Sequence, residues 1–164
     1  MLSNTAEYAL RAMSWLALTP DELVSAGNLA KATRVPADYL AKILQQLSQA
    51  GLIAGRRGVG GGYKLSKPSD SVYLLDVLQV VDPMERIFEC PVGIQSHGNH
   101  LCPLHKKIDE AIEAVHNVLG KVTLADLIDQ PGDTKPLCET PSAEESPIQP
   151  TIGQVDIRSD PTGI

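Results

Sequence analysis

The sequence predicts a mainly α-helical chain with one small β-hairpin. Apolar residues recur at helical spacing in several segments, a glycine-rich stretch separates two short strand-like runs, and aromatic residues make up only 4% of the chain. The 164 residues suit one domain with an appendage, and 43% hydrophobic with 21% charged residues is globular composition. The core is therefore expected to be aliphatic, built from Leu, Ile, Val and Ala.

Three helices are expected in the first 51 residues. The first, 5–18, has apolar residues at three-and-four spacing and ends before Pro20. Ser25 is a good N-cap for a short second helix, and Pro36 opens a third helix that ends at Gly51. Only a tight turn is left between the second and third helices.

Residues 52–65 predict the hairpin, with glycines at its tip and Arg56 and Arg57 at its edge. Two short helices joined by a tight turn and followed by a basic hairpin are the parts of a winged helix-turn-helix, in which the hairpin is the wing. Glycine readily adopts the positive φ angles of a tight wing tip. A loop that cradles a nucleotide phosphate is the alternative, but the glycines match neither common phosphate-binding motif.

The pattern further along the chain predicts helices at 72–81 and 103–119, and a short amphipathic turn or helix at 122–128. The long middle helix carries an apolar stripe that packs either into the core or against a second subunit. The stripe consists of Leu104, Ile108, Ala111, Ile112, Val115 and Leu119. The last 35 residues hold six of the twelve prolines without apolar periodicity, which is typical of disorder. We expect domains at 1–82 and 83–128 and a disordered tail at 129–164.

Charge and cysteine content restrict the partners and the compartment. The chain carries a net charge of -6, yet residues 1–68 hold eight Lys and Arg against four Asp and Glu, so this part can face a polyanion. No segment has the pattern of a signal peptide or a membrane span. Three cysteines are an odd number, which argues against a disulfide framework, and we expect a cytoplasmic protein without membrane contact.

The helix-turn-helix pattern favours double-stranded DNA as the partner, because the second helix of such a pair enters the major groove while the wing reaches the backbone. Side chains near the start of the third helix are expected to contact base edges, and those at the turn and in the wing to contact phosphates or the minor groove. The expected DNA-binding residues are Asp38, Tyr39 and Lys42, with Lys31 and Arg34 at the turn and Arg56 and Arg57 in the wing. The alternative is a protein-binding module on which these charges form a solvated face.

A second cluster of residues suits a soft metal. Cys90 and Cys102 bracket a polar loop that contains His97 and His100, and His105 follows three residues after Cys102. Thiolate and imidazole suit iron-sulfur clusters, zinc or copper, and the helix start after Cys102 stabilises negative charge there. The alternative is a pair of small loop cysteines beside solvated histidines. The chain shows no nucleophile with a base and an orienting group, so an enzyme is not expected, although a small redox or metal-binding enzyme is a rival class.

Three stretches carry a family resemblance: Ala6 to Ala12 in the first helix, Tyr39-Leu40 in the third, and Arg57 to Tyr63 in the wing. They resemble the winged-helix regulators typified by IscR, NsrR, RsrR, RirA and CymR. The resemblance covers roughly residues 1–128. It implies a homodimeric transcription factor on a palindromic operator, with the long helix as the dimer interface and a sensor loop before it.

The resemblance also implies an iron-sulfur cofactor. Cluster-bearing members typically carry three loop cysteines with five residues between neighbours, and the IscR type adds a histidine three residues after the last. Cys90, Cys102 and His105 match the first cysteine, the third cysteine and that histidine, whereas Ser96 stands at the middle position. Serine is a much poorer iron ligand than thiolate, so we expect a 2Fe-2S cluster instead of a 4Fe-4S cluster.

Two thiolates leave the remaining cluster ligands to nitrogen or oxygen donors. Glu7 stands where related proteins place a carboxylate ligand, which makes it the leading candidate across the subunit boundary. His97, His100 and His105 compete for the other site. The expected function is a DNA-binding regulator that senses redox state, iron or nitric oxide. The alternative is a cluster-free regulator of the CymR kind, controlled by a protein or small-molecule partner.

Overall fold

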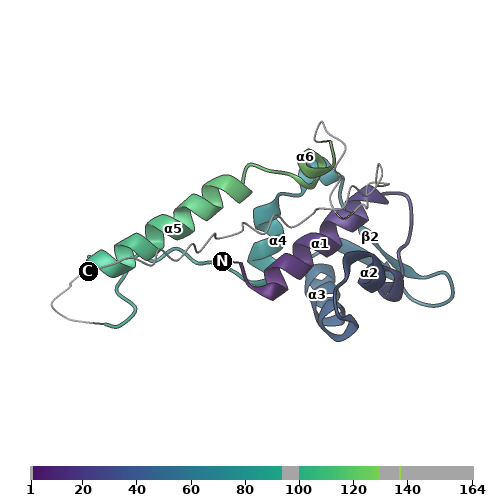
Figure 1. Ribbon diagram of the computed structural model, residues 1–164, viewed down its shortest axis with the longest axis horizontal. Coiled ribbons are helices and arrows are strands. Elements are labelled where there is room, and N and C mark those ends of the chain that lie inside the picture. The colour runs from purple at the N-terminus through teal and green to yellow at the C-terminus, as the bar shows by residue number, and fades with distance from the viewer. Residues whose placement is uncertain (1, 94–99, 130–136, 138–164) are drawn as a thin grey trace, which may run out of the picture.

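The computed structural model describes residues 2–93, 100–129 and 137. In chain order its elements are α1 (Asn4–Leu18), α2 (Ala26–Thr33), α3 (Ala37–Gln49), β1 (Ile53–Arg56), β2 (Gly62–Leu65), the short helix η1 (Ser69–Ser71), α4 (Leu74–Val81), α5 (Pro103–Leu119) and α6 (Leu124–Ile128) (Figure 1). The expected mainly α fold with a two-stranded hairpin is confirmed. Ser96, His97 and the expected tail, apart from Asp129 and Leu137, lie outside the described residues.

Local capping explains where the first two helices begin. The Ser3 hydroxyl accepts a hydrogen bond from the Ala6 amide at 3.2 Å, and Ser25 does the same for Asn28 at 3.2 Å. These bonds satisfy amides that have no partner inside their own helix. The sequence prediction that Ser25 caps the second helix is thus confirmed.

Helix α1 lies at the centre of the core and packs against α2, α3, α4 and α6. Its buried face is rich in alanine, which allows neighbouring helices to approach closely. The largest fully buried side chains are all aliphatic or methionine, as expected from the low aromatic content. They are Met13, Leu16, Leu29, Leu40, Ile43, Leu44, Leu47, Ile53, Leu78, Leu124, Val72 and Val77.

The wing is an antiparallel hairpin whose register runs from Ile53 opposite Leu65 to Arg56 opposite Gly62. Val24 pairs with Tyr63 of β2 in an isolated antiparallel bridge. The Val24 amide donates to the Tyr63 carbonyl at 3.0 Å, and the Val24 carbonyl accepts from the Tyr63 amide at 2.8 Å. Glycine is required at position 62, where an added Cβ would lie 2.6 Å from the Val24 carbonyl. The wing is therefore fixed to the loop between α1 and α2.

Two helix boundaries differ from the sequence prediction. Helix α4 begins at Leu74 and α6 at Leu124, although periodicity placed their starts at 72 and 122. The two preceding segments are extended and pair with each other. The Leu74 amide donates to the Val122 carbonyl at 2.9 Å, and the Leu124 amide donates to the Val72 carbonyl at 2.9 Å. This pairing returns the chain after α5 to the N-terminal helices.

Helix α5 extends away from the other helices, and Figure 1 shows most of its length outside the compact part of the chain. None of its residues is buried. Leu104 is 64% and Ile108 40% exposed, so the N-terminal half of the predicted apolar stripe is uncovered within the described chain, whereas Leu119 at its other end packs against the core. No helix among the described residues combines the length and apolar character needed to cross a membrane.

Candidate functional site

A polar stripe runs along the outer side of α3. Asp38, Lys42, Gln45 and Gln49 are all exposed, and their spacing of four, three and four residues places them on one face, opposite the buried leucines and isoleucine. Sequence reasoning selected the first two of these residues and missed the glutamines. The same helical period could have identified them. Glutamine amides can pair with adenine edges and lysine with guanine in a major groove.

A groove of 670 Å³ separates α3 from the wing. Gln45 and Gln49 line it from the helix, and Arg56 and Arg57 line it from the hairpin. The Arg56 side chain donates to the Gly60 carbonyl at 3.0 Å, so it also braces the wing tip. Arg57 is exposed beside it, in the position expected for a phosphate or minor-groove contact.

Lys31 and Arg34 flank the turn between α2 and α3, as the sequence predicts. Arg34 adopts the left-handed conformation at φ 54°, and its amide donates to the Lys31 carbonyl at 3.3 Å. The Val35 amide donates to the Ala30 carbonyl at 3.1 Å, which completes the helix end. Both cations line a hollow beside α1 and are not among the residues of the groove between α3 and the wing.

Tyr39 lies at the side of α3 that faces α1. Its ring meets the edge of Tyr8 at a centroid distance of 6.2 Å and remains 58% exposed. The Arg11 guanidinium lies 5.7 Å from the Tyr8 ring centroid and pairs with Glu7 in the same helix. The Glu7 side chain is 51% exposed. Its role as a ligand across a subunit boundary stays a prediction.

The thiols of Cys90 and Cys102 both lie next to the imidazole of His105. The Sγ atom of Cys102 lies 3.2 Å from Nδ1 of His105, and the Sγ atom of Cys90 lies 3.9 Å from the same nitrogen. Cys102 is the N-cap residue of α5, and Pro103 occupies the first turn. His100 is exposed. Among the described residues no three Cys, His, Asp or Glu side chains form a complete metal site.

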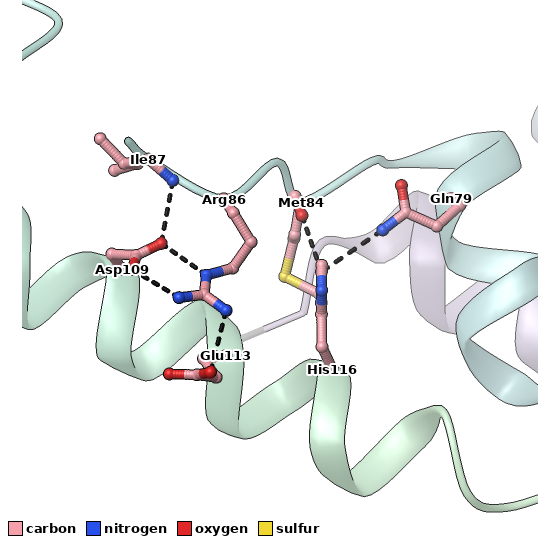
Figure 2. A network of polar contacts seen from close by, with 7 residues as sticks. All are labelled: Gln79, Met84, Arg86, Ile87, Asp109, Glu113 and His116. Atoms are coloured by element: carbon pink, nitrogen blue, oxygen red, sulfur yellow. Dashed lines mark hydrogen bonds and ion pairs between the residues drawn. The ribbon is translucent and has the colours of Figure 1, made fainter. Parts of the chain in front are cut away.

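A partly buried ion pair holds the segment that precedes Cys90 against α5 (Figure 2). The sequence pattern did not predict this pair. Arg86 Nε donates to Asp109 Oδ1 at 2.6 Å and Arg86 Nη2 donates to Oδ2 at 2.7 Å. The Ile87 amide donates to Oδ1 at 2.9 Å, and Glu113 lies 3.1 Å from Arg86 Nη1. We call these four residues the clamp. It fixes the backbone three residues before Cys90.

His116 makes a second connection between α5 and the rest of the chain. Its Nε2 atom lies 2.8 Å from the Met84 carbonyl oxygen, to which it donates when it carries the ring proton. The same atom lies 3.3 Å from Nε2 of Gln79 on α4. His116 therefore joins α5 to the linking segment and to the N-terminal helices (Figure 2).

The clamp makes the contact between α5 and the segment that precedes Cys90 dependent on pH. Hydrogen bonds from Arg86, and then from the Ile87 amide, hold the pKa of Asp109 at about 2, below its ordinary value of 3.8. A carboxylate with a lowered pKa stabilises the folded state above the ordinary value and loses that effect as the pH falls towards the lowered one. We expect Asp109→Asn to loosen the segment at neutral pH and to remove the acid-induced loosening between about pH 4 and 2. Hydrogen exchange at the Ile87 amide measures both effects, and an exchange profile equal to that of the wild type would contradict the prediction.

The geometry consists of a polar recognition helix, a basic wing and a cysteine loop at the start of a long uncovered helix. The family model described as "Rrf2: Iron-dependent Transcriptional regulator" matches residues 2–130. The chain belongs to the Rrf2 family. It is a transcriptional regulator with a DNA-binding winged helix, and this family is not one of enzymes.

Individual relatives agree with the Rrf2 assignment. An HTH-type transcriptional regulator of Aquifex aeolicus (strain VF5) is 29% identical over 131 residues, which cover 78% of this chain and 91% of that protein. CymR of B. subtilis, described as its global cysteine regulator, matches with a TM-score of 0.64 at 25% identity over 77% of this chain and 95% of its own. IscR of T. potens matches with a TM-score of 0.63 at 23% identity, covering 77% and 84%, and supports the fold.

Proposed function

We propose that this Rrf2 protein is a cytoplasmic homodimer whose affinity for a palindromic operator is controlled by an iron-sulfur cluster, of the 2Fe-2S type. The observation that carries the proposal is the meeting of the Cys90 and Cys102 thiols at His105, at the start of the helix that leads back to α4. Such a regulator senses redox state, iron or nitric oxide. Family membership alone does not imply a cluster, because the structural neighbours include CymR, which is described as a cysteine regulator. The cluster is therefore a proposal beyond the family assignment.

The donor chemistry of the loop suits an iron-sulfur cluster in part. Cys90 and Cys102 supply two thiolates, and His105 supplies a nitrogen next to both. The partner subunit's Glu7 is the leading candidate for the remaining ligand, and His97 and His100 compete with His105 for the nitrogen position. A bound cluster would supply one-electron redox chemistry, and neutral nitrogen ligands raise its reduction potential relative to thiolates.

The uncovered stripe on α5 supports the homodimer. Leu104 and Ile108 are 64% and 40% exposed, whereas the polar contacts of this helix with its own chain are made by Asp109 and His116 and its apolar contact with the core by Leu119 at the far end. Exposed apolar stripes of this kind mark interaction surfaces. A second copy packed along α5 would place two recognition helices on one duplex, with half-sites about 34 Å apart or a multiple of that distance.

The chain itself provides a connection between the cysteine loop and the DNA-binding part. Helix α5 has 17 residues and therefore spans about 25 Å. Cys102 caps its first end, and His116 contacts Gln79 of α4 close to its other end. The clamp fixes the Cys90 side of the loop to the middle of the same helix. A change in how the two thiols are held is therefore transmitted to the dimer helix and to α4.

Anaerobic purification followed by iron and acid-labile sulfide counts tests the cofactor proposal. We expect about two irons and two sulfides per subunit and a visible spectrum that bleaches reversibly on reduction. A protein that binds DNA but contains neither iron nor sulfide would instead support the cluster-free alternative. The likeness to CymR, at 25% identity for B. subtilis and 26% for the oxidized Staphylococcus aureus form, favours that alternative.

The wing contact makes a prediction independent of the cofactor. Arg57→Ala should weaken binding to all DNA sequences to a similar extent and lower the salt dependence of binding by about one counterion, because one phosphate contact is lost. Lys121→Ala, which removes an exposed cation far from the wing in sequence, is the matched control. Binding titrations at several salt concentrations measure the slope. A slope for Arg57→Ala equal to that of the control would remove Arg57 from the phosphate contacts.

A further inference from the structure

A hollow of 820 Å³ lies beside α1 and α2, outside the groove between α3 and the wing. Arg11, Lys31 and Arg34 give it a positive charge, and Trp15 and Ala32 provide apolar surface. Leu137 also lines it, although this residue lies nine positions beyond the end of α6. Leu137 therefore lies against α1 and α2 of the DNA-binding part of the chain.

Leu137 contributes an apolar side chain to the wall of this hollow. It is partly buried, and its neighbours there include Trp15. The sequence that follows, 138–164, holds five Asp and Glu against a single Arg. Glu139 is two residues from Leu137, and Glu144 and Glu145 follow within eight residues. A chain of eight residues reaches at most about 28 Å, so these carboxylates are tethered within reach of the basic hollow.

We propose that the acidic segment 139–145 docks on the basic hollow, with Leu137 as its apolar anchor, and competes with DNA phosphates for Lys31 and Arg34. Charge complementarity and the location of Leu137 identify the occupant. Each exposed ion pair contributes little, about 0.2–1 kcal/mol, but a tethered segment has a high effective concentration. The competition with DNA depends on the proposed function, whereas docking of the segment does not.

Trp15 offers a direct readout, because it lines the hollow and is the single tryptophan of the chain. The full-length triple variant Glu139→Gln/Glu144→Gln/Glu145→Gln should show stronger acrylamide quenching of Trp15 fluorescence than the wild type. Leu137→Ser should act in the same direction. Raising the salt from about 50 mM to 500 mM should increase quenching in the wild type and leave the triple variant unchanged, since salt screens exposed charges.

A charge-matched control separates docking from a general effect of net charge. Asp21→Asn/Glu22→Gln neutralises two exposed carboxylates far from the tail in sequence, as Glu144→Gln/Glu145→Gln does within it. We expect increased quenching of Trp15 only in the tail variant. Equal quenching in the wild type and all tail variants would show that another group, or none, covers the hollow, and would overturn the proposal.

DNA titrations test the competition. The triple variant should bind double-stranded DNA roughly threefold to tenfold more tightly than the wild type at low salt. Increased Trp15 quenching with unchanged DNA affinity would overturn the competition. Increased quenching in a protein that binds no DNA would confirm docking and contradict the proposed function, so the two failures are distinguishable.

Discussion

Replacing both Cys90 and Cys102 with alanine is expected to abolish iron binding and the redox dependence of operator affinity together. The two thiols meet at Nδ1 of His105, at 3.9 and 3.2 Å, and no other described cysteine could substitute for them. Thiolates are the principal ligands of iron-sulfur clusters. Iron counts and operator titrations of the oxidised and reduced forms measure the two effects.

The third cysteine provides a control for the double variant. Cys138 lies in the C-terminal part of the sequence, beyond Leu137, and Cys138→Ala should keep both the iron content and the redox response of the wild type. The double variant should still fold, because both loop cysteines are only partly buried. A double variant that responds to redox state as the wild type does would contradict the proposed sensor.

Ile108→Asp is expected to convert the homodimer into a monomer and to weaken operator binding by about 100-fold or more. Ile108 is 40% exposed on the uncovered stripe of α5, so an aspartate there disrupts little within the chain but places a charge in the proposed dimer interface. Joining two DNA-binding modules raises the overall affinity by about 10²–10⁴. Analytical ultracentrifugation and operator titrations measure the two effects.

Lys106→Asp is the matched control on the same helix. It introduces the same carboxylate at an exposed position outside the apolar stripe, and the variant should remain dimeric. A dimeric Ile108→Asp protein would place the dimer interface elsewhere. A monomeric one that keeps wild-type operator affinity would separate dimer formation from operator binding.

The sequence was sufficient for the elements whose signals are local. Helical periodicity and a capping residue predicted α1, α2 and α3. The glycine run predicted the wing, the hairpin formed by β1 and β2. The position of Cys102 at the start of α5 followed from Pro103, a residue type favoured in the first helical turn. These features depend on residues within a few positions of one another.

The contacts that hold the cysteine loop could not be predicted in this way. Arg86 and Asp109 are 23 positions apart, and His116 meets Met84 across 32 positions. Each residue alone is a typical exposed polar side chain of a helix or linker. Only the folded chain brings them together. The same reason explains the two helix starts, because pairing between distant extended segments overrides the local helical pattern at positions 72 and 122.

Operator affinity of the anaerobically purified dimer, measured in the oxidised and the reduced state at one fixed salt concentration, tests the central claim most directly. We predict that the two states differ in affinity by about fivefold or more, the coupling typical of allosteric control, and that Cys90→Ala/Cys102→Ala removes the difference. Equal affinities of the oxidised and reduced iron-containing protein would contradict control of DNA binding by a redox-active cluster at this loop.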